Sequence, residues 1–277
     1  MTDGTLKFGQ LSLYGVVDIY GGTVPQYTRL KNYGTLNIHG NDSVWEQSYH
    51  LEGNGTLNFI AGEFDGTAKM FSTLNNKSGS MTFSGTISVD MGNYFNGDLI
   101  YVTGSLDQTL ISASSIGDQF TIESNLKDCM LLKDWNVQQI GNDLVLTFDG
   151  PITEVDTSTS TSVTGFGEEG WLKLTGTPTE EPITLTMEYT GLGSAEDFVR
   201  WLNESMGETQ GSVNVSWNEN SIVFSDLLLD NNGIGHLYLD YSAYNSYHRE
   251  AFPEPATWAM LIIGLTVSSF FRKRKGR

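Results

Sequence analysis

Positive charge is scarce in this sequence. Only 15 lysines and arginines stand against 33 aspartates and glutamates, which gives a formal net charge of −18. Binding to a phosphate backbone needs clustered cations, so the composition excludes a generic nucleic-acid-binding protein. Five of the fifteen cations follow residue 271, at Arg272, Lys273, Arg274, Lys275 and Arg277. An acidic body with a short basic end indicates a chain that meets two environments.

Cysteine and proline are also rare, with one and six residues, and long helical periodicity is nearly absent. A single cysteine excludes an intrachain disulfide. Cys129 lies in an apolar stretch, which favours a buried core residue over a reactive thiol. The 31 glycines stand among many Thr, Ser, Asn and Val residues, and aromatic residues make up 12%. This composition predicts a folded, mainly β protein.

Motifs that carry chemistry are missing too. The four histidines, His39, His50, His236 and His248, never stand at the spacing of a metal motif. No nucleophile elbow and no phosphate-binding loop occur. The run 230–233 (Asp-Asn-Asn-Gly) lacks the acidic partners of a calcium loop, so it is interpreted as a hairpin turn. We therefore expect no catalytic residue, no metal site and no cofactor.

A short pattern recurs in the first half. A glycine precedes two apolar residues separated by one polar residue, the alternation of a half-buried strand. The four copies begin at Gly9, Gly34, Gly55 and Gly79. One strand in every 20–25 residues is typical of a parallel β-solenoid, so residues 1–150 are predicted to form one. An ordinary antiparallel meander is the alternative, because the pattern is short.

Residues 97–107 and 135–146 loosely resemble the final coils of autotransporter passenger solenoids. That resemblance implies an extracellular, adhesin-like or matrix scaffold, without chemistry. Met1 falls directly into a repeat-like run with no capping segment and no secretory signal peptide before it. We therefore expect further coils and a signal peptide upstream of Met1.

The second half reads as a small β-rich module over 151–245. Its boundary is marked by Gly150-Pro151 and by the run 156–163 of alternating Thr and Ser. One helix is predicted, with Ser194 as its cap and Asp197 in its first turn. The aromatic strip Tyr241, Tyr244, Tyr247 and His248 is interpreted as a last strand and spacer, or alternatively as a carbohydrate-stacking surface.

The C-terminal segment has three parts: a spacer at 246–255, an uncharged apolar stretch at 256–271 and a basic tail at 272–277. The sixteen apolar residues would form a helix of about 24 Å, so a single short transmembrane helix is predicted. The cations that follow it are expected to stay cytoplasmic, which places the acidic body outside.

Pro253-Glu254-Pro255, the apolar stretch and the basic tail resemble, in this order, the PEP-CTERM sorting signal of bacterial surface proteins. The resemblance covers Phe252 to Arg277. It implies that the tripeptide is recognised and processed by exosortase, a membrane transpeptidase. It also implies export of the body to the cell surface or to an exopolysaccharide matrix. Arg272, Lys273, Arg274 and Lys275 would then fix the orientation in the membrane.

Two functions are therefore considered. The first is a surface-displayed structural or interaction protein, whose partners would be exosortase, the membrane and possibly an exopolysaccharide. The second is an extracellular polysaccharide lyase or hydrolase on a β-solenoid. Such an enzyme would need acidic residues from neighbouring coils beside a basic residue. The candidate residues are Arg29, Lys31, Asp18, Asp42 and Asp65.

Overall fold

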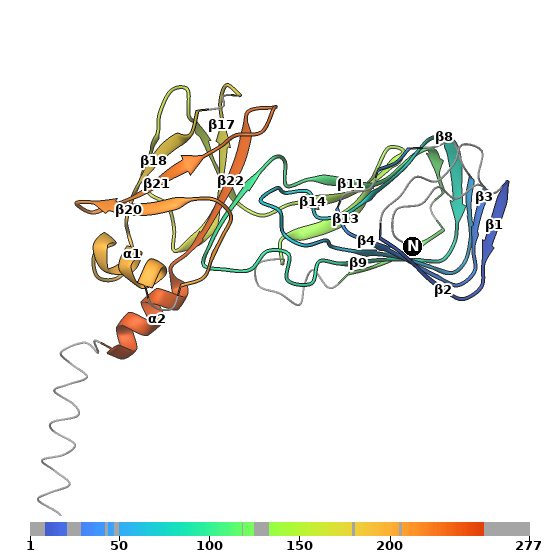
Figure 1. Cartoon of the computed structure of the whole chain (residues 1–277), viewed down its shortest axis with the longest axis horizontal. Helices are drawn as coiled ribbons and strands as arrows, with labels where there is room; N and C mark the ends of the chain where they lie inside the picture. The colour runs from blue at the N-terminus through green and yellow to red at the C-terminus, as the bar shows by residue number, and fades with distance from the viewer. Residues whose placement is uncertain are drawn as a thin grey trace, which may run out of the picture.

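The computed structural model describes residues 9–20, 29–41, 44–46, 50–117, 119–124, 133–178, 181–204 and 207–251. These residues form a mainly β structure with two helices. The predicted β class is confirmed. Figure 1 shows an elongated molecule with two parallel sheets at one end and a second β-rich part with both helices at the other.

The first end contains two sheets whose strands alternate along the chain. In one sheet the strands β1 (Gln10–Leu13), β3 (Arg29–Asn32), β6 (His50–Gly53), β8 (Thr73–Phe83) and β11 (Gln108–Ile116) run parallel. In the other, all strands are parallel: β2 (Val16–Ile19), β4 (Thr35–His39), β7 (Thr56–Ile60), β9 (Thr86–Asp90) and β12 (Thr121–Ser124). Successive pairs of strands thus stack on one another, one strand in each sheet.

Two further features complete the first sheet. The short strand β5 (Val44–Glu46) also pairs with β8. An antiparallel hairpin of β13 (Trp135–Ile140) and β14 (Asp143–Phe148) continues the sheet beyond β11. Residues 135–146 are therefore a hairpin, whereas the resemblance to final coils implied further stacked strands.

A column of glycines explains part of the repeated sequence pattern. Gly34, Gly55 and Gly85 stand just before β4, β7 and β9. A Cβ atom on each would lie 2.1, 2.1 and 1.9 Å from the backbone oxygen of Gly15, Gly34 and Gly55, respectively. Real Cβ atoms essentially never come within 3.0 Å of another heavy atom. Only glycine lets neighbouring backbones approach this closely.

The four predicted repeat copies do not stack in one sheet, because two of them belong to each of the two sheets. The copies at Gly34 and Gly55 lead into β4 and β7, which pair in register. The copies at Gly9 and Gly79 belong instead to β1 and β8 in the other sheet. The matching glycines are Gly15 and Gly85, before β2 and β9. Strands of both sheets show the same alternation, so the pattern alone did not separate them.

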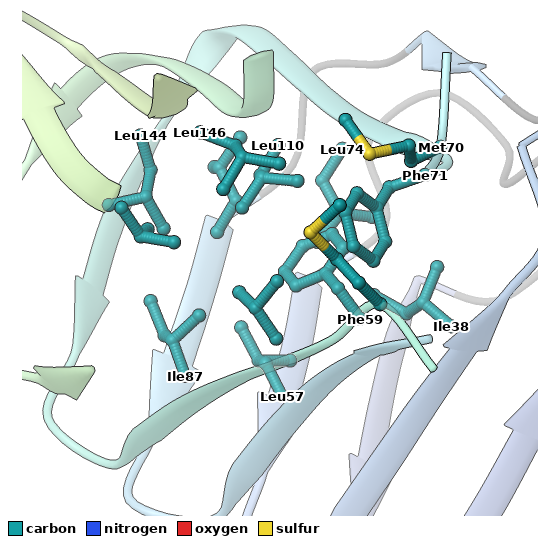
Figure 2. Packing of buried hydrophobic residues seen from close by; sticks show 14 of the residues in the cluster. Ile38, Leu57, Phe59, Met70, Phe71, Leu74, Ile87, Leu110, Leu144 and Leu146 are labelled. Carbon is teal, nitrogen blue, oxygen red and sulfur yellow. The ribbon is translucent and has the colours of Figure 1, made fainter. Parts of the chain in front are cut away.

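The two sheets bury their inner faces against each other. Figure 2 shows Ile38, Leu57 and Ile87 facing Leu110, Leu144 and Leu146 across the core. In-register columns such as Leu36, Leu57 and Ile87 are fully buried. Each such side chain contributes about 1.5–3 kcal/mol relative to an exposed position.

The second part contains two more sheets. The five-stranded one has the order β15 (Ile152–Asp156), β17 (Glu169–Thr175), β22 (Ile234–Asp240), β10 (Leu99–Thr103) and β19 (Thr209–Gln210). The four-stranded one has the order β16 (Ser162–Val163), β18 (Ile183–Glu188), β21 (Ser221–Leu227) and β20 (Asn214–Asn218). Their shared core includes Leu172, Leu185, Phe224 and Leu237.

Strand β10 links the two parts. It comes from the first half of the chain, between β9 and β11, yet it pairs antiparallel with β22 and parallel with β19. The sheets therefore do not divide at residue 150, and residues 97–107 are not a further coil of the parallel sheets. The chain leaves the first part, adds one central strand to the second and returns.

Helix α1 (Ala195–Glu204) begins as the sequence predicts. The backbone N–H of Asp197 donates to Oγ of Ser194 over 3.1 Å, and Oγ of Ser194 donates to the Asp197 carboxylate over 2.6 Å. Ser194 thus caps the helix and satisfies a free amide of its first turn. The helix buries Ala195, Phe198, Val199, Trp201 and Leu202.

A second helix, α2 (Ser242–Ala251), occupies the residues for which a last strand and a spacer were predicted. That prediction is wrong. Tyr241 and Tyr244 are buried, 0% and 2% exposed, in a cluster of rings with Phe198 and Tyr189. Both rings belong to the core, so they do not form the carbohydrate-stacking surface that was the alternative.

No helix in the described ranges is long and apolar enough to cross a membrane. The predicted membrane helix at 256–271, the motif Pro253-Glu254-Pro255 and the tail with Arg272, Lys273, Arg274 and Lys275 lie outside the described residues. Cys129, predicted to be a buried core residue, lies outside them as well.

Candidate binding groove between the two parts

A groove lies where the parallel sheets meet the five-stranded sheet that contains β10 and β22, called the C-terminal sheet below. Its volume is about 570 Å³, within the usual range for ligand pockets. Segments 65–73 and 103–109 and the loop before β22 surround it. Its lining residues are Asn41, Asp65, Thr67, Ala68, Lys69, Thr73, Thr103, Gly104, Ser105, Asp107, Gln108, Thr109 and Asp230. Nearly all carry polar side chains.

Gln108, at the start of β11, fixes one side of the groove. Its Oε1 accepts hydrogen bonds from the backbone N–H of Met70 (2.8 Å) and Phe71 (3.1 Å). Its amide nitrogen donates to the carbonyl of Phe71. Gln108 is 8% exposed. Residues 70–71 lie in no strand, so the Gln108 side chain supplies the hydrogen bonds that their buried backbone groups need. The groove therefore has a rigid side.

Asp65 anchors the adjacent turn. Its Oδ1 accepts from the Thr67 backbone N–H (3.0 Å), from the Thr67 hydroxyl (2.7 Å) and from the Tyr94 hydroxyl (3.2 Å). Its Oδ2 accepts from the Asn41 amide over 3.1 Å. Burial, with the Asp65 charge beside it, raises the pKa of Tyr94 to about 12, so the phenol remains a donor. Both oxygens of Asp65 are thus engaged by the protein.

Asp230 closes the groove from the C-terminal sheet. Its Oδ1 accepts from the backbone N–H groups of Asn232 (2.9 Å) and Ile234 (2.8 Å), and its Oδ2 accepts from the Asn232 amide over 3.1 Å. A turn was predicted at 230–233 and is present. It is not a hairpin, because β21 and β22 lie in different sheets.

His236 supports the same corner from inside. Its Nδ1 lies 2.8 Å from the carbonyl oxygen of Gly104, so this nitrogen carries the proton and donates. The ring is 3% exposed, and burial lowers the pKa of His236 to about 4. The imidazole therefore stays neutral at physiological pH and holds Gly104 at the rim of the groove.

Two charged groups of the lining keep free hydrogen-bonding capacity. Asp107 uses Oδ1 to accept from the Phe148 backbone N–H over 2.9 Å. Within the described ranges, its Oδ2 has no donor and the Lys69 ammonium has no carboxylate within ion-pair distance. The described part of the chain also holds no group of three His, Cys, Asp or Glu residues arranged for a metal ion.

The predicted enzyme residues do not gather in one site: Arg29 and Lys31 share a partner, but the described aspartates lie elsewhere. The side chain of Arg29 pairs with Glu52 over 2.6 Å, and Lys31 approaches Glu52 over 3.3 Å. The Arg29 hydrogen bond lowers the pKa of the Glu52 carboxyl. Asp18 lies in the other sheet, and Asp65 lines the groove. The described residues thus show no cluster of aspartates beside Arg29, and Asp42 lies outside them.

Asp18 belongs to a ladder of polar side chains on the outer face of its sheet. It accepts from the Asn37 amide (2.8 Å) and contacts Nε2 of His39 (3.0 Å), while Asn58 donates to Asn37 over 3.2 Å. The His39 and Asn37 hydrogen bonds lower the pKa of Asp18. The carboxylate therefore stabilises the stacking of three strands.

Most groove residues were missed by the sequence analysis. The sequence analysis considered only Asp65, as a candidate enzyme residue, and Asp230, as part of the turn at 230–233. Lys69, Asp107 and Gln108 carry no motif, and β10 brings segments 65–73 and 230–234 together through a crossover that no local pattern indicates. Comparisons with known proteins add no relative: no family model matches the chain, and neither a curated protein nor a solved structure matches it significantly.

Proposed function

We propose that this chain is an exported cell-surface or matrix protein of structural or interaction type. Its body would be a parallel β-solenoid, and its C-terminal segment a PEP-CTERM sorting signal. The observation that supports the scaffold most strongly is the register of the two parallel sheets. Alternate strands of the chain stack in order, with β2, β4, β7 and β9 aligned residue by residue. Extended stacks of this kind present long, regular outer surfaces.

The sorting part of the proposal depends on the sequence at 252–277. Proline fixes φ and biases the residue before it toward extended structure, which would keep Pro253-Glu254-Pro255 out of the following helix. Glu254 would supply a charge that a membrane enzyme reads near the bilayer surface. The short apolar stretch at 256–271 would then serve as a sorting handle rather than a permanent anchor.

The sorting proposal is tested by expressing the chain behind a secretory signal in a bacterium that carries exosortase. We expect intact mass to show the parent without residues 256–277, and Glu254→Ala with them. Glu250→Ala removes a carboxylate four residues upstream and serves as the matched control, which should be processed like the parent. A parent that keeps residues 256–277 and stays membrane-bound would make the segment a plain anchor.

The orientation is tested separately. Neutral replacements at Arg272, Lys273, Arg274 and Lys275 remove the cations that would hold the tail in the cytoplasm. We expect reduced protease accessibility of the acidic body in intact cells. Unchanged display would contradict the proposed topology.

A further inference from the structure

The groove between the two parts offers unused hydrogen-bonding groups of both kinds. Asp65 and Asp230 are already engaged on both oxygens by the protein. Asp107 keeps a free acceptor, Oδ2, and Lys69 keeps a free ammonium donor, as described above. Ser105 adds a hydroxyl to the lining, whereas the amide of Gln108 is already engaged by Met70 and Phe71. A ligand that fits must therefore both donate and accept hydrogen bonds.

The lining charges argue against an anionic ligand. Three carboxylates, Asp65, Asp107 and Asp230, stand against the single ammonium of Lys69. An anionic ligand in the groove would be repelled by these carboxylates, and the body as a whole is already strongly negative. The described residues also lack a cluster suited to a metal ion.

The lining is amphipathic. Ala68 is the one lining residue with an apolar side chain, but carbon atoms of the polar residues supply most of the groove surface. A fully apolar ligand would leave the polar groups unpaired, whereas a sugar ring carries C–H faces and hydroxyl groups together. Hydroxyl groups of a sugar are donors and acceptors at once, so they match a carboxylate oxygen, an ammonium and a hydroxyl that line the same groove.

We propose that this groove binds a neutral saccharide. Asp107 Oδ2 accepts from sugar hydroxyls, and the Lys69 ammonium donates to hydroxyl or ring oxygens. This inference deepens the proposed function by naming the ligand class of an exported interaction protein, and it rests on that function only for its biological setting. Because both parts of the protein contribute lining residues, a bound sugar also ties the C-terminal sheet to the parallel sheets.

Binding is tested by isothermal titration calorimetry on the full chain, purified in a detergent without a sugar headgroup. The neutral probes are cellohexaose, mannohexaose and N-acetylchitohexaose. An oligogalacturonate serves as the anionic probe, and a neutral hexapeptide represents the other ligand class. We expect at least one neutral saccharide to bind more tightly than the oligogalacturonate and the peptide.

Two groove variants locate the site. Asp107→Asn keeps an acceptor for the Phe148 amide, and Lys69→Met keeps the length of the side chain, so both should fold, as thermal melting would check. Hydrogen bonds to charged groups contribute about 1.5–3 kcal/mol, so each variant should weaken binding about tenfold or more. Glu188→Gln, an exposed carboxylate on β18, is the matched control and should bind like the parent.

Three results would overturn the proposal: no binding of any neutral saccharide, tighter binding of the oligogalacturonate or the peptide, or saccharide binding that neither groove variant weakens. None of these results concerns processing at Glu254. Conversely, an unprocessed C-terminal segment would leave the calorimetry unaffected, so the two proposals fail independently.

Discussion

The glycine column makes a sharp prediction about how the parallel strands stack. In Gly55→Ala, the new Cβ would lie 2.1 Å from the backbone oxygen of Gly34. That oxygen must retreat to at least 3.0 Å, a movement of 0.9 Å. The same oxygen accepts the Thr56 backbone N–H over 2.7 Å. A retreat along the stacking direction lengthens this bond to about 3.6 Å, which is no longer a hydrogen bond.

The cost of Gly55→Ala follows from these displacements. Leaving a backbone carbonyl and an amide unpaired costs about 1–3 kcal/mol, and overpacking costs about 1–3 kcal/mol more. We therefore expect Gly55→Ala to lower the free energy of unfolding by about 3 kcal/mol. Urea unfolding followed by circular dichroism measures this difference.

Gly15→Ala is the matched control. Gly15 occupies the same column, but an added Cβ there meets no atom of the described residues within 4 Å, and its φ is not in the left-handed region. Alanine at such a position changes stability little, or raises it by about 0.4–1 kcal/mol through the unfolded chain. Equal unfolding free energies for Gly55→Ala and Gly15→Ala would refute the close-approach argument.

Three further predictions concern the second part. Burial lowers the pKa of His236 to about 4, so the unfolded chain takes up this proton first, and stability present above pH 6.5 should be lost as the pH falls toward 4. The loss should be about 2.4 kcal/mol and be absent from His236→Gln, when urea unfolding is compared at pH 7 and pH 4.5; equal pH dependence would contradict it. Asn245→Ala should cost about 1–3 kcal/mol, because its Oδ1 accepts the Leu192 N–H over 2.9 Å; proteolysis of α2 no faster than in the parent would count against this contact. Ser194→Ala should cost about 1 kcal/mol through the lost cap, measured by thermal melting, and an unchanged melting temperature would show that Asp197 alone suffices.

Local features were predictable from the sequence, and contacts made by distant segments were not. The strand alternation at 35–39 and 56–60 and the capping residue Ser194 each depend on a few neighbouring residues, and each is confirmed. The position of β10 depends on pairings with residues more than 100 positions away, which no local pattern encodes. The groove depends on that pairing, so the sequence could not indicate it.

The sequence of helix α2 contains a spacing typical of a helix, but its aromatic composition led to the prediction of a strand. Its aromatic residues favour strands by composition. However, Asp240 accepts the backbone N–H of Ser242 over 2.6 Å, as a helix cap does, and Tyr241, Tyr244 and His248 stand three and four residues apart. That spacing places their rings on one face, with Tyr241 and Tyr244 against Phe198 and His248 beside Tyr244. Spacing would have been the better guide than residue type.

The position of β22 determines how the protein would carry a mechanical load. This strand lies directly before α2 and the C-terminal segment, and it is paired antiparallel on both sides, with β10 and with β17. Antiparallel hydrogen bonds stand perpendicular to the strands, so a pull along β22 loads all of them together in shear instead of opening them one by one. A force applied at the C-terminus would thus pass into β10. From β10 it would reach the parallel sheets through the chain segments that connect β10 to β9 and to β11. A protein held at this end would resist extension as one body.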